Sequence, residues 1–227
     1  MSTIVAKWGP GSVILGSDSR TTVKLRGMPI GYADFDQKVF VMPESRFAIG
    51  IAGQAAIGDV FVSSLVSGYV RVADRFGMCF AADVLEGISR YLREMSGAHY
   101  DRLSLWIVVA GGDPASGGVA LLRNGRISVI RRSFGFVCSH GCYDPFSWLF
   151  SEPAKVALSV RRHISSHIRR SVVSGGDIDV LKVSCDGYEW LSRRLLPITV
   201  ATVKQFLQQV ESGQVRLLAC ERRIRDI

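Results

Sequence analysis

The sequence lacks a long apolar run, since no segment reaches the roughly 18 consecutive apolar residues of a membrane-spanning helix. Its start also lacks the basic-then-apolar pattern of a signal peptide, because Lys7 and Trp8 fall in a strand-like stretch. We therefore expect no membrane partner.

Cysteine is scarce and shows no repeated spacing. The 227 residues contain five, at Cys79, Cys138, Cys142, Cys185 and Cys220. An odd number without a pattern argues against a disulfide framework and for reduced thiols, so we expect a cytoplasmic location.

Acidic residues are in the minority, with 20 Asp and Glu against 28 Lys and Arg, a net charge of +8. Much of the excess lies in arginine pairs, such as Arg161-Arg162 and Arg193-Arg194. This balance permits nucleic-acid or acidic partners. No basic–aromatic interleaving or nucleic-acid-binding module accompanies it. Solvated helix faces and ion pairs between subunits explain the charge better, so no nucleic-acid partner is expected.

No Pro/Ser-rich linker, low-complexity segment or internal repeat divides the chain, and 48% of its residues are hydrophobic. A single domain over residues 1–227 is therefore expected. Runs of alternating or helical periodicity, separated by Gly, Pro and Asn-Gly signals, predict the elements. Strands are expected at 3–8, 12–16, 38–42, 46–52, 103–110, 119–123, 126–131, up to 138, 179–184 and 188–192. Helices are expected at 54–75, 84–95, 143–150, 153–171 and 198–209, and a polar loop at 21–37.

Strands and helices thus occur in alternating groups, which is typical of an α+β protein with mainly antiparallel sheets. Two sheets face to face, each covered by a helix pair, would satisfy every apolar face. The predicted fold is therefore a four-layer αββα sandwich.

Ser2 is the candidate nucleophile. Met before a small residue is the usual substrate for initiator-methionine removal, which would make Ser2 the amino terminus. A free α-amine has a pKa of roughly 7.7–8.0 and can act as the base for its own residue's hydroxyl.

Six short motifs follow one another along the chain: Ser2-Thr3-Ile4-Val5, Ser17-Asp18-Ser19-Arg20, Gln37-Lys38-Val39-Phe40, Gly50-Ile51-Ala52-Gly53-Gln54-Ala55-Ala56, Cys138-Ser139-His140-Gly141 and Ser174-Gly175-Gly176. Together they resemble proteasome β-type subunits, the N-terminal-nucleophile (Ntn) hydrolase family that includes bacterial HslV-type peptidases. The resemblance covers nearly the whole chain, which looks like a bacterial proteasome homologue.

This resemblance implies a role for each matched residue. Ser2 Oγ would attack a peptide carbonyl while its amine takes the proton. The Lys38 ammonium would favour the alkoxide, Asp18 would hold Lys38, and the Gly53 N–H would bind the oxyanion. The remaining implied positions are Ser139 and Ser174 tuning the amine, Ile51 and Ala55 lining a medium-sized apolar pocket, and Arg20, Thr21 and Thr22 binding substrate.

Each of these residues also has an ordinary structural interpretation. Asp18 could cap its own turn, and Lys38 at a strand start could be a solvated edge charge. Gly53 could simply let a strand turn into a helix, and Ser174 could end one.

The resemblance implies a subunit of a self-compartmentalising peptidase: a homo-oligomeric double ring of six or seven subunits per ring, without a cofactor. Peptides or unfolded proteins would be its substrates, and an ATPase or other regulator could feed it. Ser171 departs from the family, which has aspartate there, and Ser2 replaces the usual threonine. A catalytically silent ring or scaffold protein, a small-molecule amide hydrolase and a basic nucleic-acid-binding protein are the alternatives.

Two motifs could suggest a metal, but neither is complete. His163 and His167 are four apart on an expected helix, yet arginines flank both, which favours a solvated or interface face. Cys138-x-His140-x-Cys142 has no second Cys or His pair nearby. No metal ion is expected.

Overall fold

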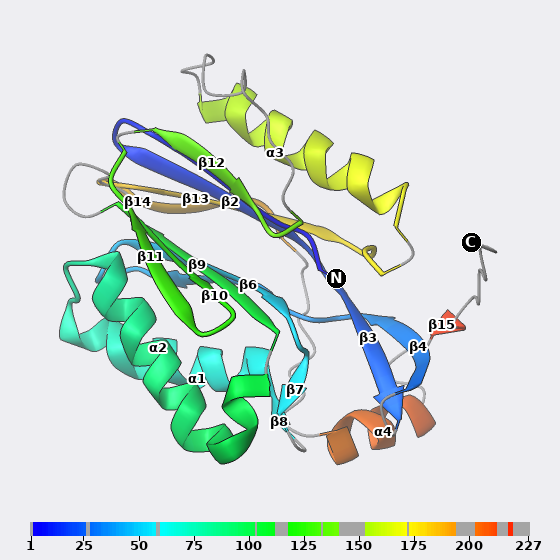
Figure 1. The fold of residues 1–227 in the computed structure, drawn as a ribbon. Coiled ribbons are helices and arrows are strands. Elements are labelled where there is room, and N and C mark those ends of the chain that lie inside the picture. The colour runs from blue at the N-terminus through cyan, green and yellow to red at the C-terminus, as the bar shows by residue number, and fades with distance from the viewer. Residues whose placement is uncertain are drawn as a thin grey trace.

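The computed structural model describes residues 2–25, 28–57, 60–102, 104–111, 118–132, 134–140, 153–171, 173–193, 203–212 and 218–219. Two five-stranded antiparallel sheets dominate it (Figure 1). The first sheet has the order β12-β1-β2-β13-β14, with β12 at Gly135–Cys138, β1 at Ile4–Gly9, β2 at Ser12–Asp18, β13 at Ile178–Ser184 and β14 at Gly187–Ser192. The second has the order β11-β10-β9-β6-β5, with β11 at Arg126–Ile130, β10 at Val119–Arg123, β9 at Leu105–Gly111, β6 at Phe47–Gly53 and β5 at Val39–Met42.

The two sheets pack face to face through an apolar layer. Its members include Ile4, Leu15, Val39 and Val108, all fully buried. Gly50 allows the close approach, since a Cβ there would lie 2.7 Å from Ile4 Cγ2. Burial on both faces explains why Val13, Ile14 and Leu15 in β2 are consecutive apolar residues rather than alternating with polar ones.

Helices α1 (Val62–Ala73) and α2 (Ala81–Ser96) cover the other face of the second sheet (Figure 1). Short 3₁₀ turns at Asp74–Phe76 and Gly97–Arg102 follow them. Helix α3 (Pro153–Ile168) covers the first sheet, burying Val160 and Ile164 completely. At Gly16 an added Cβ would lie 2.5 Å from Val160 Cγ1, so this glycine lets α3 sit close to β2.

A third sheet, β15-β4-β3, stands apart from these layers. It contains β3 (Arg20–Leu25), β4 (Met28–Asp34) and β15 (Leu218–Ala219). Helix α4 (Val203–Glu211) joins it through Phe206, whose ring stacks on Phe35 with centroids 5.2 Å apart. A two-stranded pair, β7 (Ala56–Ile57) and β8 (Val60–Phe61), precedes α1.

The predicted four-layer αββα sandwich with a helix pair on each sheet is wrong. The described part of the chain is mostly strand, with fifteen strands in four antiparallel sheets against four α-helices. A single described helix, α3, covers the first sheet, and α4 packs on the third sheet instead. The expected helix at 143–150 lies outside the described residues.

Two local expectations are also wrong. The polar loop expected at 21–37 is largely the β3–β4 hairpin, and the helix expected from 54 begins only at Val62, after β7 and β8. Most other strands and the helix after Pro153 lie within a few residues of their expected places. Asn124-Gly125 forms the expected turn, with φ of 49° and 76°.

Among the described helices, none is both long and apolar enough to cross a membrane. The described cysteines Cys79, Cys138 and Cys185 are thiols and not part of a disulfide.

Candidate active site

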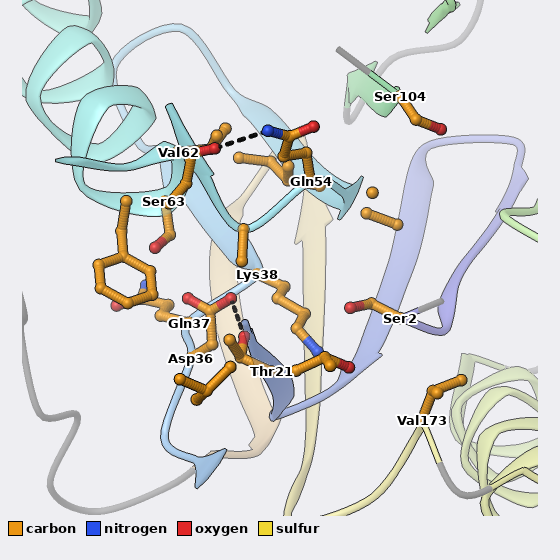
Figure 2. Close-up of a pocket in the computed structure, with 18 of the residues that line it drawn as sticks. Ser2, Thr21, Asp36, Gln37, Lys38, Gln54, Val62, Ser63, Ser104 and Val173 are labelled. Atoms are coloured by element: carbon orange, nitrogen blue, oxygen red, sulfur yellow. Dashed lines mark hydrogen bonds between the residues drawn. The ribbon is translucent and has the colours of Figure 1, made fainter. Parts of the chain in front are cut away.

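A cavity of about 520 Å³ opens where β1 begins, β6 ends and β3 runs alongside (Figure 2). Most of the candidate site residues line it: Ser2, Thr21, Thr22, Lys38, Ile51, Gly53 and Ala55. Figure 2 shows the Ser2 side chain directed towards Lys38. Ser2 is half-buried, so its hydroxyl has access to the cavity.

Lys38 and Asp18 form a buried ion pair beside this cavity. Lys38 Nζ lies 3.1 Å from Asp18 Oδ1, and the two side chains are 4% and 0% exposed. The ammonium also donates to the backbone carbonyl of Arg20. The solvated-edge interpretation of Lys38 is therefore wrong, because this ammonium is fixed in the interior beside the cavity that Ser2 also lines.

Backbone donors hold Asp18 from two directions. Its Oδ1 accepts from the Thr3 N–H at 2.8 Å, and its Oδ2 accepts from the Gly175 N–H at 2.9 Å. Asp18 thus ties the start of β1 to the 174–176 loop as well as to Lys38. This explains how a carboxylate can remain buried, since its oxygens accept from an ammonium and two N–H groups.

The Ser-Gly-Gly loop at residues 174–176 packs against Arg20 and the start of β1. A Cβ at Gly175 would lie 2.5 Å from the Arg20 guanidinium carbon, and Gly176 has a φ of +74°. The Ser174 hydroxyl lies 3.0 Å from Thr3 Oγ1. The loop therefore contacts the start of β1 directly.

Ser139 contacts the same segment from the other side. Its hydroxyl donates to the Ser2 carbonyl at 2.8 Å and accepts from the Ile4 N–H at 3.0 Å. Both Ser139 and Ser174 thus lie against residues 2–4. Their tuning of a free Ser2 amine stays a prediction.

Gly53 ends β6 in a conformation that other residues rarely adopt, with a φ of +118°. A Cβ there would lie 1.9 Å from the Ser104 carbonyl oxygen. The neighbouring Ser104 backbone and the positive φ therefore require glycine at this position, and binding of an oxyanion by its N–H stays a prediction.

Arg20 is not among the described residues that line the cavity. Its guanidinium forms a two-point ion pair with Asp34, at 2.7 and 2.9 Å, and the hydrogen bond to Asp34 raises the pKa of Arg20. The prediction that the Arg20 side chain binds substrate therefore has no support in this arrangement. Arg20 instead contributes its carbonyl to Lys38.

The sequence did not identify the polar wall of the cavity. Asp36 lines it and accepts a hydrogen bond from Thr21 Oγ1 at 2.7 Å (Figure 2). Burial raises the pKa of Asp36, while Lys38 and the Thr21 and Ser63 hydroxyls oppose the shift. The cavity is therefore not the purely apolar pocket that Ile51 and Ala55 suggested. An acidic residue two positions before Lys38 was the available signal.

No protein-family model matches the chain, and no curated protein matches it.

Proposed function

We propose that this chain is a peptidase subunit whose Ser2, freed by removal of Met1, hydrolyses peptide bonds. One observation carries the proposal: Ser2 shares a cavity with an ammonium that is held in the interior by a buried aspartate. Peptide hydrolysis needs a nucleophile, a base and charge stabilisation within reach of one another. Ser2 and Lys38 support the first and the third of these roles, and removal of Met1 would supply the base as the Ser2 α-amine.

In this mechanism, Ser2 Oγ attacks the carbonyl carbon and passes its proton to its own α-amine. The Lys38 ammonium stabilises the developing alkoxide, and the Gly53 N–H donates to the oxyanion. Collapse of the tetrahedral intermediate breaks the C–N bond, and the departing amine takes the proton from the α-ammonium. Water then attacks the ester on Ser2, and the same amine accepts and returns a proton.

The cavity is of the size that binds a small ligand or a peptide side chain. Ile51 and Ala55 supply apolar contact, while Asp36 and Thr21 supply polar atoms deeper in the wall. Side chains with an apolar stem and a hydrogen-bonding end fit this lining better than purely apolar ones.

We further propose a homo-oligomer in stacked rings, with six or seven subunits in each. Helix α1 itself gives no reason for a partner, since its apolar residues Leu65, Val66 and Val70 are buried within the chain. Support comes instead from three large apolar side chains around the α1–α2 connection. Val72, Phe76 and Phe80 are 61%, 77% and 53% exposed. An ATPase or other regulator would dock on such an assembly.

The test is hydrolysis of a fluorogenic peptide panel by the wild type, Ser2→Ala and Ser166→Ala. Ser166 is an exposed serine on α3 and serves as the matched control. We expect Ser2→Ala to lose at least a thousandfold in kcat/KM while Ser166→Ala keeps wild-type activity. Equal hydrolysis by Ser2→Ala and wild type would overturn the proposal. A 25 kDa particle in light scattering at micromolar concentration would overturn the ring.

A catalytically silent ring subunit is the second candidate, and Ser171 favours it. The resemblance places an aspartate at this position, in the network around the amine, and serine cannot supply its charge. If the protein keeps Met1 in an intact-mass measurement, Ser2 has no free amine and the silent subunit is the correct assignment.

A further inference from the structure

Three of the four histidines of the chain gather around one buried cysteine, on the side of the first sheet that α3 covers. Cys138 ends β12 and His140 follows two residues later, while His163 and His167 lie one turn apart on α3. Each motif alone is a weak metal signal. The fold brings the two together because α3 packs across β1 and β2, next to β12.

The distances among these groups suit a tetrahedral ion. Cys138 Sγ lies 3.1 Å from His140 Nε2 and 3.7 Å from His163 Nε2. One ligand atom from each of the three residues lies within 4.8 Å of the other two. Zinc bonds of about 2.3 Å to sulfur and 2.0–2.1 Å to nitrogen, at tetrahedral angles, separate the two ligand atoms by about 3.6 Å. Small side-chain rotations would therefore complete the site.

The histidines face the protein rather than solvent. Cys138 is 8% exposed, and His163 lies one position before the fully buried Ile164. Both histidines on α3 are half-buried, whereas the arginines that flank them are exposed. The arginines therefore occupy the outer side of the helix, and the histidines face the first sheet more than the arginines do.

The His140 ring packs against both histidines of α3. His140 Nδ1 is buried without a hydrogen-bond partner in the described part of the chain. His167 stacks on His140 with centroids 3.7 Å apart and planes at 16°. Among the described residues, the three ligand atoms that lie within 4.8 Å of one another include no nitrogen of His167, so we assign His167 the role of positioning His140.

We propose that Cys138, His140 and His163 bind a divalent transition-metal ion of the zinc class, through one thiolate and two imidazole nitrogens. Sulfur and imidazole ligands exclude magnesium and calcium, which prefer oxygen. Three protein ligands leave the fourth position to water or an exogenous ligand. Binding releases the thiol proton of Cys138 to solvent.

The site would stiffen the start of the chain. Ser139 sits between two of the ligands, and its hydroxyl bonds the Ser2 carbonyl and the Ile4 N–H. An ion holding Cys138 and His140 would therefore fix the turn on which residues 2–4 rest. The metal proposal uses none of the peptidase groups and stands independently of that activity.

The experiment is a titration of untagged, reduced, metal-depleted full-length protein with Co²⁺, followed by Zn²⁺ competition against a chromophoric chelator. We expect one equivalent per chain, a thiolate-to-cobalt charge-transfer band, and visible bands of tetrahedral intensity. Cys138→Ser should abolish the charge-transfer band, and His140→Gln and His163→Gln should each weaken zinc binding at least a hundredfold. His167→Gln should retain the band with about tenfold weaker binding.

His99→Gln and Cys185→Ser are the controls, because both residues are exposed and distant in sequence from the cluster. They should bind like the wild type. Because Cys138 is buried, the thermal midpoint of each variant without metal is also measured, and metal should raise it for wild type but not for His163→Gln. A wild type that binds no micromolar zinc would overturn the site and leave only a thiol–imidazole pair. So would equal loss of binding in His99→Gln, which indicates adventitious surface metal.

Discussion

Replacing Lys38 by methionine tests the buried ion pair while keeping an unbranched side chain of similar length. The change would leave Asp18, which is fully buried, with a carboxylate bonded only by the N–H groups of Thr3 and Gly175 among the contacts described. Removing one partner of a buried pair costs about 3–5 kcal/mol, because the other charge stays desolvated. Since two N–H bonds remain, we expect the lower end, about 3 kcal/mol.

Urea unfolding followed by circular dichroism measures this loss in the free energy of unfolding. With a slope of about 2–3 kcal/mol per molar urea, the midpoint should fall by about 1 M or more. Arg90→Met is the matched control. Arg90 pairs with Glu86 at 3.6 Å on the surface, where the side chains are 72% and 66% exposed. Its loss should cost less than about 0.5 kcal/mol.

A Lys38→Met midpoint equal to that of Arg90→Met would refute the reasoning, because it would show that the Asp18 carboxylate is not desolvated. The free energy of unfolding of the double variant Asp18→Asn/Lys38→Met provides a second test. It removes both charges, so it should be more stable than the sum of the two single losses predicts.

Three further changes test other parts of the structure. Gly53→Ala should lower the thermal midpoint by several degrees and abolish any hydrolysis, because its Cβ would meet the Ser104 carbonyl at a φ of +118°. A wild-type midpoint would contradict that geometry. Phe206→Ala should cost about 3–5 kcal/mol in urea unfolding, since its fully buried ring anchors α4; a loss below about 1 kcal/mol would show that the helix is not docked. The thermal midpoint of Asp36→Asn should rise relative to that of the wild type as pH increases from 4 to 7. The raised pKa means that folded wild type binds the proton more tightly than the unfolded chain, so its stability falls as that proton leaves. A thermal-midpoint difference independent of pH would contradict this.

Local signals predicted the strands well, because turn residues and alternation act over a few neighbouring positions. Asn124 and Gly125 at positive φ are one example. The sequence did not predict the β3–β4 hairpin, because polar residues in this segment suggested a loop. A strand that is distant in the sequence stabilises the pairing. Strand β4 pairs with β15, where Leu218 lies opposite Tyr32, and no local pattern reports such a contact.

The candidate site was also predicted only in part, because sequence motifs identify some of its residues and the tertiary fold alone shows the others. Family-like motifs identified Asp18 and Lys38, and the structure brings them together across twenty residues of sequence. Asp36 was missed, because only the tertiary fold shows that its carboxylate is buried in the cavity wall. The Cys138 and His163 pairing was missed for the same reason, since it depends on where α3 lies against the first sheet.

The most direct test of the central claim is the covalent labelling of the purified protein by a peptide electrophile that reacts with N-terminal nucleophiles. Intact mass should first show loss of about one methionine, and tandem mass spectrometry should then place one label per chain on Ser2. Lys38→Met should label at least a hundredfold more slowly, because the ammonium that favours the alkoxide is gone. Retention of Met1, or a label on any residue other than Ser2, would contradict the account.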